Sequence, residues 1–159
     1  MMFEIDDTAA AVADLLWREH ADELLRFATV LVGPFDAHDI VVDAFLGAVP
    51  SLARPGVDNP RAYLFRAVRN RVVDLRRSSE RRWNRDLAAI RPATMSPADP
   101  LIDVRRAVAA LSVAQRAVVF FVYWDDLTET KTAEVLQISP GTVRRHLTRA
   151  QAHLRKALR

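Results

Sequence analysis

The segment LTETKTAEVLQISPGTVRRHLTRAQAHL (Leu127–Leu154) predicts two helices separated by a tight turn. Thr128 is suited to cap a short helix that ends near Leu136, because a threonine oxygen can accept a hydrogen bond from a free N–H of the first turn. Ser139 caps the second helix in the same way, and Pro140 stands at its first position, where no N–H is needed. Two helices joined by about three residues, the second of them basic, form the helix-turn-helix pattern.

The second of these helices has one apolar face and one basic face. Its apolar residues fall within about 80 degrees of a helical wheel; they are Val143, Leu147, Ala150, Leu154 and Leu158. The other face holds Gly141, Thr142, Arg144, Arg145, Thr148, Arg149, Arg155, Lys156 and Arg159. No acid occurs from Val135 onward, although a solvated helix usually mixes both signs of charge. We expect guanidinium groups that suit phosphates and guanine edges; a merely solvated cationic helix is the alternative.

The composition excludes several classes of protein. Half of the 159 residues are apolar, so the chain can bury a core, and the absence of cysteine excludes disulfides and thiolate zinc sites. The N-terminus MMFEIDDTAA carries acids where a secretory signal carries positive charge, and no apolar run approaches the roughly 20 residues of a membrane span. We therefore expect a cytoplasmic protein without membrane insertion.

Charge is divided unevenly along the chain. Residues 1–58 hold eleven acids against three arginines, whereas residues 61–85 hold nine arginines against Asp74 and Glu80. One acidic and two basic segments predict two kinds of partner, with nucleic acid for the basic segments. A genomic preference for arginine over lysine, 21 to 2 here, explains which cation is used but not where the acids are missing.

The remaining periodicity is helical, which predicts an all-α fold. An apolar stripe from Leu24 ends at Gly33 and Pro34, and Asp36 is expected to cap the next helix. A proline-rich loop precedes a long basic helix that starts at Pro60, and RPATMSPADP (Arg91–Pro100) is a linker. The sequence thus predicts two small helical domains, residues 10–84 and 101–159, joined by a flexible linker over residues 85–100.

Three segments in this order resemble bacterial RNA polymerase sigma factors of the extracytoplasmic-function (ECF) type. The sequence LSVAQRAVVFFVYWDDLTETKTAEVLQISPGTVRRHLTRAQAHLRKAL is similar to their region 4 helix-turn-helix. DAHDIVVDAFLGAV resembles their region 2.2, and NPRAYLFRAVRNRVVDLRR resembles regions 2.3 and 2.4. The resemblance extends from about Leu15 to Leu158. It implies promoter-specific transcription initiation with the polymerase core, no catalytic activity and no cofactor.

The resemblance also implies roles for individual residues. Thr142, Arg144, Arg145, Thr148 and Arg149 stand in the helix that reads the minus-thirty-five promoter element. Asn70 matches a contact to the minus-ten element, the loop Leu52–Asn59 matches one that captures a flipped base, and Arg66, Arg69, Arg76 and Arg77 are expected to hold phosphates. Tyr63 and Phe65 could stack on unpaired bases; for each of them a place in the core is the favoured alternative, and Phe65 is the stronger core candidate. Asp39 and Asp43 match the surface that docks on the polymerase clamp helices, and the flap is the expected second contact on the polymerase.

The sequence departs from the family pattern at three positions. Val42 replaces a glutamine associated with polymerase contact, Gln137 replaces a glycine at the turn, and Thr132 replaces an aliphatic core residue. Backbone strain at Gln137 and a buried hydroxyl at Thr132 are each expected to cost roughly 1 kcal/mol.

Two other functions remain as alternatives. A stand-alone helix-turn-helix regulator would bind duplex DNA tightly by itself, but it leaves the basic helix from Pro60 unexplained. A metal enzyme could use His20, Asp22, His38, Asp39 and Asp43, yet no nucleophile or phosphate-binding loop accompanies them. The family often has an anti-sigma partner, which the sequence does not identify, and the promoters are equally undetermined.

Overall fold

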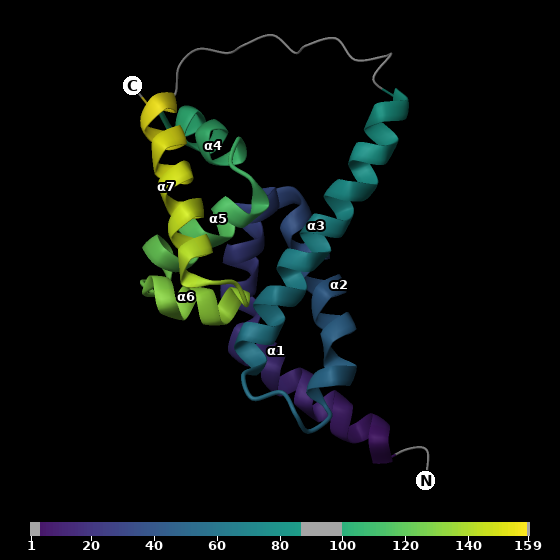
Figure 1. Cartoon of the computed structure of the whole chain (residues 1–159). Coiled ribbons are helices and arrows are strands. Elements are labelled where there is room, and N and C mark those ends of the chain that lie inside the picture. Colours follow the sequence, from purple (N-terminus) through teal and green to yellow (C-terminus); the bar gives the residue numbers. More distant parts are fainter. Residues whose placement is uncertain (1–3, 87–99, 159) are drawn as a thin grey trace.

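The computed structural model describes residues 4–86 and 100–158, and every regular element within these ranges is a helix. Figure 1 shows the helices in chain order: α1 (Glu4–Val32), α2 (Pro34–Leu52), α3 (Pro60–Asp86), α4 (Pro100–Ala109), α5 (Val113–Val119), the π-helical turn η1 (Phe120–Trp124), α6 (Glu129–Leu136) and α7 (Pro140–Ala157). The prediction of an all-α fold is confirmed. The predicted linker, residues 85–100, lies outside the described residues except at its ends, which belong to α3 and α4.

The junction between α1 and α2 follows from two residues. Gly33 has φ 90 and ψ 169, a conformation that glycine adopts easily, and Pro34 then opens α2. The predicted end of the first helix is therefore confirmed. The prediction that Asp36 caps α2 is wrong, because proline starts the helix two residues earlier and Gly33 is the N-cap. Asp36 lies instead in the first turn, where its negative charge favours the positive end of the helix.

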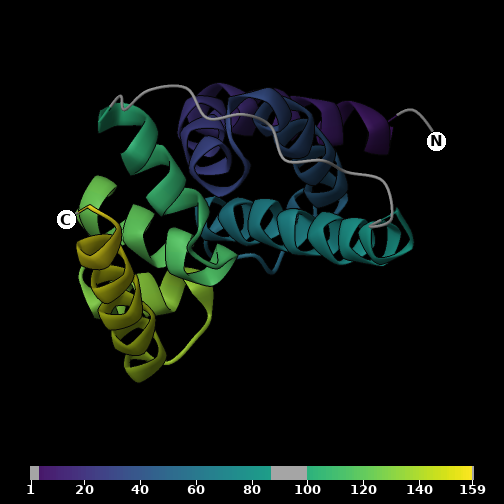
Figure 2. The same cartoon turned by 90° about the horizontal axis from the view of Figure 1, so that it is seen from above.

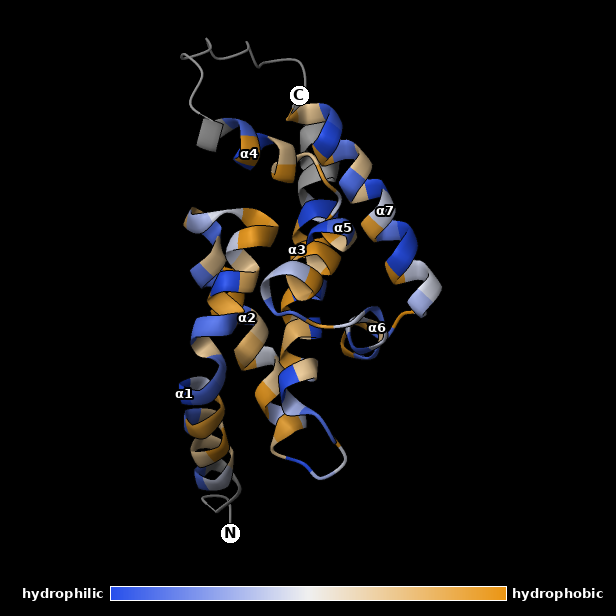
Figure 3. Cartoon of the chain, turned by 90° about the vertical axis from the view of Figure 1, so that its left-hand side faces the viewer, coloured by the Kyte–Doolittle hydropathy of each residue, from blue (hydrophilic) through white to orange (hydrophobic). Residues whose placement is uncertain are grey.

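Helices α1, α2 and α3 form the first unit of the chain, and each is amphipathic. Figure 3 shows hydrophobic and hydrophilic residues, in orange and blue, interleaved along them. Their buried apolar residues are Leu16, Leu24, Phe27, Ala28, Leu31, Ala37, Ile40, Val41, Ala44, Phe45, Ala48, Ala62, Leu64, Phe65, Val68 and Val72. The regular spacing of these residues along each helix places the basic side chains of α3 on the opposite face.

The helix-turn-helix is formed by α6 and α7 with the predicted caps. The side chain of Thr128 accepts from the backbone N–H of Lys131 at 3.2 Å, and that of Ser139 accepts from the N–H of Thr142 at 3.1 Å. The expected weaknesses are also present. Gln137 has the left-handed conformation φ 53, ψ 48, and the fully buried Thr132 has an Oγ1 without a hydrogen-bond partner. The turn thus keeps its geometry at the cost of local strain.

The second unit, α4 to α7, packs against the first through a common aromatic core. Figure 2 shows the two units side by side, with α3 beside the second unit. Phe27 of α1 and Phe65 of α3 meet Phe120 and Phe121 of η1, with ring centroids 5.0 to 6.2 Å apart. All four side chains are buried. The sequence predicted two units but no contact between them.

A charged side chain also crosses this boundary. Arg116 of α5 is buried, and its Nη1 donates to the carbonyl of Leu31 in α1 while its Nε donates to the carbonyl of Leu111. Burial, together with the nearby charge of Arg76, lowers the pKa of Arg116 to about 10. The guanidinium therefore remains charged at neutral pH, and it ties the second unit to the C-terminal end of α1.

Candidate nucleic-acid interface

The outer face of α7 carries the predicted recognition residues. Arg144, Arg145, Thr148 and Arg149 are exposed and Thr142 is half-buried, while Val143 and Ala150 are fully buried on the inner face. The structure therefore brings the five residues together on one accessible helix face. Such a face fits the major groove of duplex DNA, which admits one α-helix.

Several of these side chains are held in place before any ligand binds. Arg144 donates from Nε to Oε2 of Glu129 at 3.0 Å, and Arg145 donates from Nη2 to Oγ1 of Thr142 at 3.2 Å. Within residues 4–86 and 100–158, Arg149 makes no hydrogen bond or ion pair. Of the three arginines predicted to read DNA, Arg149 is thus the one whose guanidinium has no partner in this part of the chain.

His146 lies between these arginines and is half-buried, with an Nδ1 that has no hydrogen-bond partner. Burial and the positive charges of Arg145 and Arg149 lower the pKa of His146. At neutral pH the imidazole is therefore neutral and adds no charge to the basic face. No signal in the sequence indicated this, since a histidine among arginines is read as one more cation.

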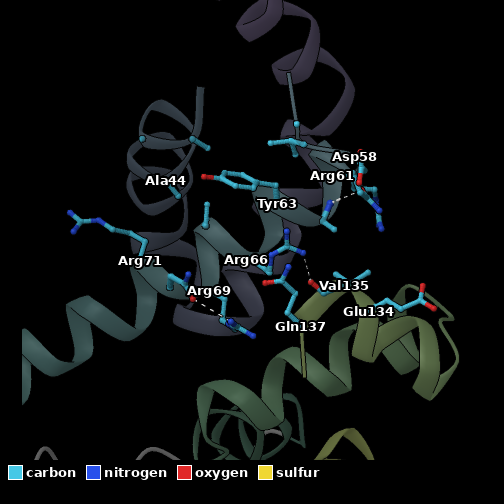
Figure 4. A pocket seen from close by; sticks show the side chains of 18 of the residues that line it. Ala44, Asp58, Arg61, Tyr63, Arg66, Arg69, Arg71, Glu134, Val135 and Gln137 are labelled. Atoms are coloured by element: carbon cyan, nitrogen blue, oxygen red, sulfur yellow. Dashed lines mark hydrogen bonds between the residues drawn. The ribbon is translucent and has the colours of Figure 1, made fainter. Parts of the chain in front are cut away.

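A second candidate surface lies on α3, above a cleft of ≈1110 Å³ (Figure 4). Tyr63, Arg66 and Asn70 line it from α3, and the residues after α2 contribute Asp58 and Asn59. Tyr63 is half-buried with Cζ of Arg66 lying 5.9 Å from its ring centroid. The cleft thus combines an aromatic ring, an amide and guanidinium groups, which are the elements of a single-strand binding groove.

The opposite wall of this cleft belongs to the second unit. Lys131, Glu134 and Gln137 of the α6 region line it. Arg66 donates from Nη1 to the carbonyl of Val135 at 3.0 Å, and Arg69 donates from Nη1 to the carbonyl of Leu136 at 3.0 Å. These two arginines were expected to hold phosphates, and in this structure they hold the C-terminal end of α6.

The other predicted residues of α3 have different surroundings. Asn70 is exposed and its Oδ1 accepts from Nη2 of Arg69 at 3.3 Å. Arg76 and Arg77 are exposed farther along the helix, away from the cleft lining. Phe65 is fully buried in the aromatic core, so its interpretation as a core residue is confirmed.

The acidic candidates lie on α2. Asp39 is almost fully exposed, with 94% of its side-chain surface accessible, whereas Asp43 accepts from Nη2 of Arg71 at 2.8 Å. Both aspartates line one hollow of ≈460 Å³, together with Asp36 and Arg71. The structure therefore brings Asp39 and Asp43 together on one surface, with Asp43 already paired.

Sequence reasoning missed a bridge between the two units. Arg61 lies 2.9 Å from Glu23 and 2.7 Å from Asp125, measured from Nη2 to carboxylate oxygens. Burial opposes the charge of Arg61, but hydrogen bonds and attraction from both carboxylates outweigh it and raise its pKa. From the sequence, Arg61 was only one of the basic residues of its segment. Its pairing with Asp125 could not be predicted, because it depends on how helices far apart in the sequence pack together.

In the part of the chain that the structure describes, no group of three or more histidines and acids is arranged to hold a metal ion. In the same residues no single helix is long and apolar enough to cross a membrane, although one bent pair, Asp103–Ala109 with Val113–Trp124, passes by length and composition.

Known proteins match the chain over nearly its whole length. Residues 16–82 match the family Sigma-70 region 2, and residues 101–154 match Sigma-70 region 4. The ECF RNA polymerase sigma factor SigL of Mycobacterium tuberculosis is 32% identical over 174 residues, which cover 99% of this chain and 96% of SigL. SigM of the same organism is 31% identical over 149 residues, covering 91% of this chain and 76% of SigM.

Solved structures share the fold. The sigma factor RpoE, in complex with the anti-sigma factor NepR from Bartonella quintana, matches with a TM-score of 0.71 and 24% identity, over 91% of this chain and 95% of RpoE. CnrH, in complex with the cytosolic domain of CnrY, matches with a TM-score of 0.63 and 24% identity, over 95% of this chain and 94% of CnrH. Together with the identity to SigL over almost the full length, these findings show that the chain belongs to the ECF sigma factors of bacterial RNA polymerase.

Proposed function

We propose that this protein initiates transcription by binding core RNA polymerase and directing it to promoters through α7 and α3. The observation that carries this proposal is the outer face of α7, where Arg144, Arg145, Thr148 and Arg149 are all exposed while the inner face is buried. We assign this face, with Thr142, to the minus-thirty-five element. Arginine forks recognise guanine edges and phosphates there, and the buried face keeps the helix rigid.

The face of α3 is assigned to the minus-ten element. Asn70 contacts a base and Tyr63 stacks on an unpaired one, with the loop Leu52–Asn59 closing the groove beside them. Arg66, Arg69, Arg76 and Arg77 hold phosphates and so position the strand without reading it. The cleft lined by Tyr63, Arg66 and Asn70 supports this division of roles.

Docking on the polymerase is assigned to α2, where Asp39 and Asp43 face the clamp helices; the flap contacts the second unit. The exposure of Asp39 supports this assignment. Val42 lies between the two aspartates and is half-buried, and its apolar side chain offers no hydrogen-bonding group to a partner. RpoE is known in complex with the anti-sigma factor NepR, and by analogy an anti-sigma protein is a third partner of this chain.

The protein acts as a non-catalytic factor in the cytoplasm, where the polymerase is found. A stand-alone regulator is not favoured, because both sigma regions match in order and the relative SigL matches over 99% of the chain. A regulator would also leave the cleft on α3 without a role.

In vitro transcription tests the proposal. Purified core polymerase is given a library of promoter fragments with and without this protein, and the transcripts are sequenced. We expect start sites that share an upstream and a downstream element and that vanish when the protein is omitted. Absence of specific transcripts, combined with tight duplex binding by the isolated protein, would instead establish a stand-alone regulator.

A further inference from the structure

His146 lies on the edge of the outer face of α7. Successive residues of a helix are about 100 degrees apart, so His146 shares one stripe with Thr142 and Arg149, a turn away in each direction. On its other side lies Ala150, which is fully buried. The ring of His146 is half-buried, and it therefore stands where the packed face of the helix meets the exposed one.

The two ring nitrogens of His146 have different surroundings. Nδ1 is buried and has no hydrogen-bond partner within residues 4–86 and 100–158, whereas Nε2 is not closed off from solvent in this way. A neutral imidazole has one donor and one acceptor, but a protonated imidazole has two donors. Because these residues offer no acceptor for a proton on Nδ1, the free protein favours the neutral ring.

The charges that act on the ring also oppose its protonation. Burial, followed by the positive charges of Arg145 and Arg149, lowers its pKa. The elements packed against α7 are α4, α5 and α6. Their charged residues, as far as the structure describes them, are Asp103, Arg105, Arg106, Arg116, Glu129, Lys131 and Glu134. None of these bonds to the ring, and the two acids of α6 are already held in ion pairs.

Bound DNA would reverse these effects. A helix with its side chains is about 10 to 12 Å wide, which is about the width of the major groove, so the edges of the helix meet the phosphates of the groove walls. A phosphate oxygen supplies the acceptor that the ring lacks, and rotation about the Cβ–Cγ bond brings a ring nitrogen to it. The negative charge of the phosphates also offsets the repulsion from Arg145 and Arg149.

We propose that α7 binds DNA with the uptake of one proton: His146, at the edge of the outer face, accepts a proton from solvent and contacts a backbone phosphate as an imidazolium. The inference rests on the proposed function of α7. The proton returns to solvent when the DNA leaves. A phosphate contact adds affinity without reading a base, so binding to every promoter strengthens as the pH falls through the neutral range. The arginines of α7 keep their charge throughout this range.

Promoter binding at several pH values tests the proposal. Holoenzymes made with wild type and with His146→Gln are titrated onto one fluorescent promoter fragment, obtained from the transcription experiment, between about pH 8 and about pH 6. Effects of pH on the polymerase are common to both proteins. Proton uptake can raise the wild-type affinity by up to about tenfold per pH unit beyond this common change. We expect the ratio of the two affinities to grow at least about 3-fold over the range. A constant ratio overturns the proposal.

Two other variants separate charge from the loss of a histidine. His146→Arg carries a permanent charge, so it should follow the pH dependence of His146→Gln but bind more tightly throughout. His153→Gln removes an exposed histidine from the same helix and should keep the wild-type pH dependence. A pH dependence that disappears with His153 and persists without His146 overturns the proposal. If circular dichroism shows that His146→Gln does not fold, the comparison of wild type with His146→Arg decides.

A phosphate contact has two further signatures. The salt slope of the wild type should be steeper by about one unit at low pH than at high pH, and this difference should be absent in His146→Gln. The gain at low pH should also be equal on promoters that differ in single upstream bases; a gain confined to one base overturns the phosphate contact. Failure of the proposed function is separate, because wild-type holoenzyme would then bind no promoter fragment specifically at any pH.

Discussion

Arg144 of α7 and Glu129 of α6 form an ion pair across the helix-turn-helix, in which Nε and Nη2 of the arginine each lie 3.0 Å from Oε2 of the glutamate. Glu129 is also in the first turn of α6, where a negative charge is favourable. Arg144 is exposed and Glu129 is half-buried, so the pair remains open to solvent and contributes little to stability, but it fixes the direction of a side chain on the outer face of α7.

We therefore expect Glu129→Ala to change promoter choice more than stability. The free energy of unfolding should fall by less than about 1 kcal/mol, as is usual for exposed pairs. In the holoenzyme, preference at the base read by Arg144 should weaken, because the guanidinium is no longer oriented. Asp103→Ala, an exposed acid on α4 outside both candidate surfaces, is the control. Equal base preference in wild type and Glu129→Ala would show that Arg144 is not a base-reading residue.

Substitutions of Arg149 and Lys156 distinguish a contact that reads a base from a contact that only holds the DNA backbone. Both are exposed on α7, but Lys156 lies nearly two turns farther along the helix. Arg149→Ala should cost about 1 to 3 kcal/mol at one or two upstream positions, because a bidentate contact to guanine is lost. Lys156→Ala should weaken binding to every promoter alike and reduce the salt slope by about one unit. Binding titrations of holoenzyme on promoter variants at several salt concentrations measure both effects; a uniform loss for both variants contradicts base reading by Arg149.

Asp39 gives a cleaner test of docking than Asp43. Reversing Asp43 also breaks its pair with Arg71, whereas the exposed Asp39 is paired, within the part of the chain that the structure describes, with His38 alone, at 3.8 Å. We expect Asp39→Arg to weaken binding to core polymerase, most strongly at low salt, because an exposed charge acts mainly through long-range attraction. Asp103→Arg on α4 makes the same charge change on the second unit. Equal affinities of the two variants in a polymerase titration would remove Asp39 from the interface.

Thr132→Val should stabilise the protein. The Oγ1 of Thr132 is buried without a partner, so folding removes a hydroxyl from water and gives it no hydrogen bond. Valine keeps the shape and removes this cost, which predicts a gain of about 1 kcal/mol in the free energy of unfolding. Thr130→Val at an exposed position of α6 controls for β-branching. Urea denaturation compares the two; a loss of stability in Thr132→Val would mean that the hydroxyl has a partner, such as an ordered water.

The lowered pKa of His146 predicts that the stability of the protein depends on pH. Burial and the charges of Arg145 and Arg149 hold its pKa below the ordinary value of 6.5. As pH falls through 6.5 the unfolded chain takes up a proton that the folded chain does not, so stability falls until the pKa of the folded state is passed. His146→Gln should make this decline shallower, measured as urea midpoints between about pH 7.5 and pH 5. His153→Gln, exposed on the same helix, controls for loss of a histidine.

Local features of the fold followed from the sequence. The caps Thr128 and Ser139, the break at Gly33 and Pro34, and the strained turn at Gln137 were all predicted, because each depends on the conformation of a few neighbouring residues. The prediction that Asp36 caps α2 also concerned only neighbouring residues, and it was wrong. The sequence offered two possible helix starts, and the helix begins at Pro34 and not after Asp36.

The residues of α7 were assigned correctly to its two faces except at the end of the helix, where Leu158, predicted on the packed apolar face, is 49% exposed. Periodicity shows which residues of a helix share a face, and charge shows which face meets water. The outer arginines Arg144, Arg145 and Arg149 are exposed as their spacing indicated, and Val143 is buried. Their roles in promoter recognition remain predictions that the experiments above address.

Contacts between the two units were decided only by the tertiary structure. A helical period shows that Phe65 turns inward, but not that Phe120 and Phe121 from a distant segment cover it. In the same way, a run of arginines marks Arg66 and Arg69 as cations without naming their partner. Their partners are carbonyls left free at the end of α6, and such backbone groups exist in every helix, so no residue type in the sequence distinguishes them.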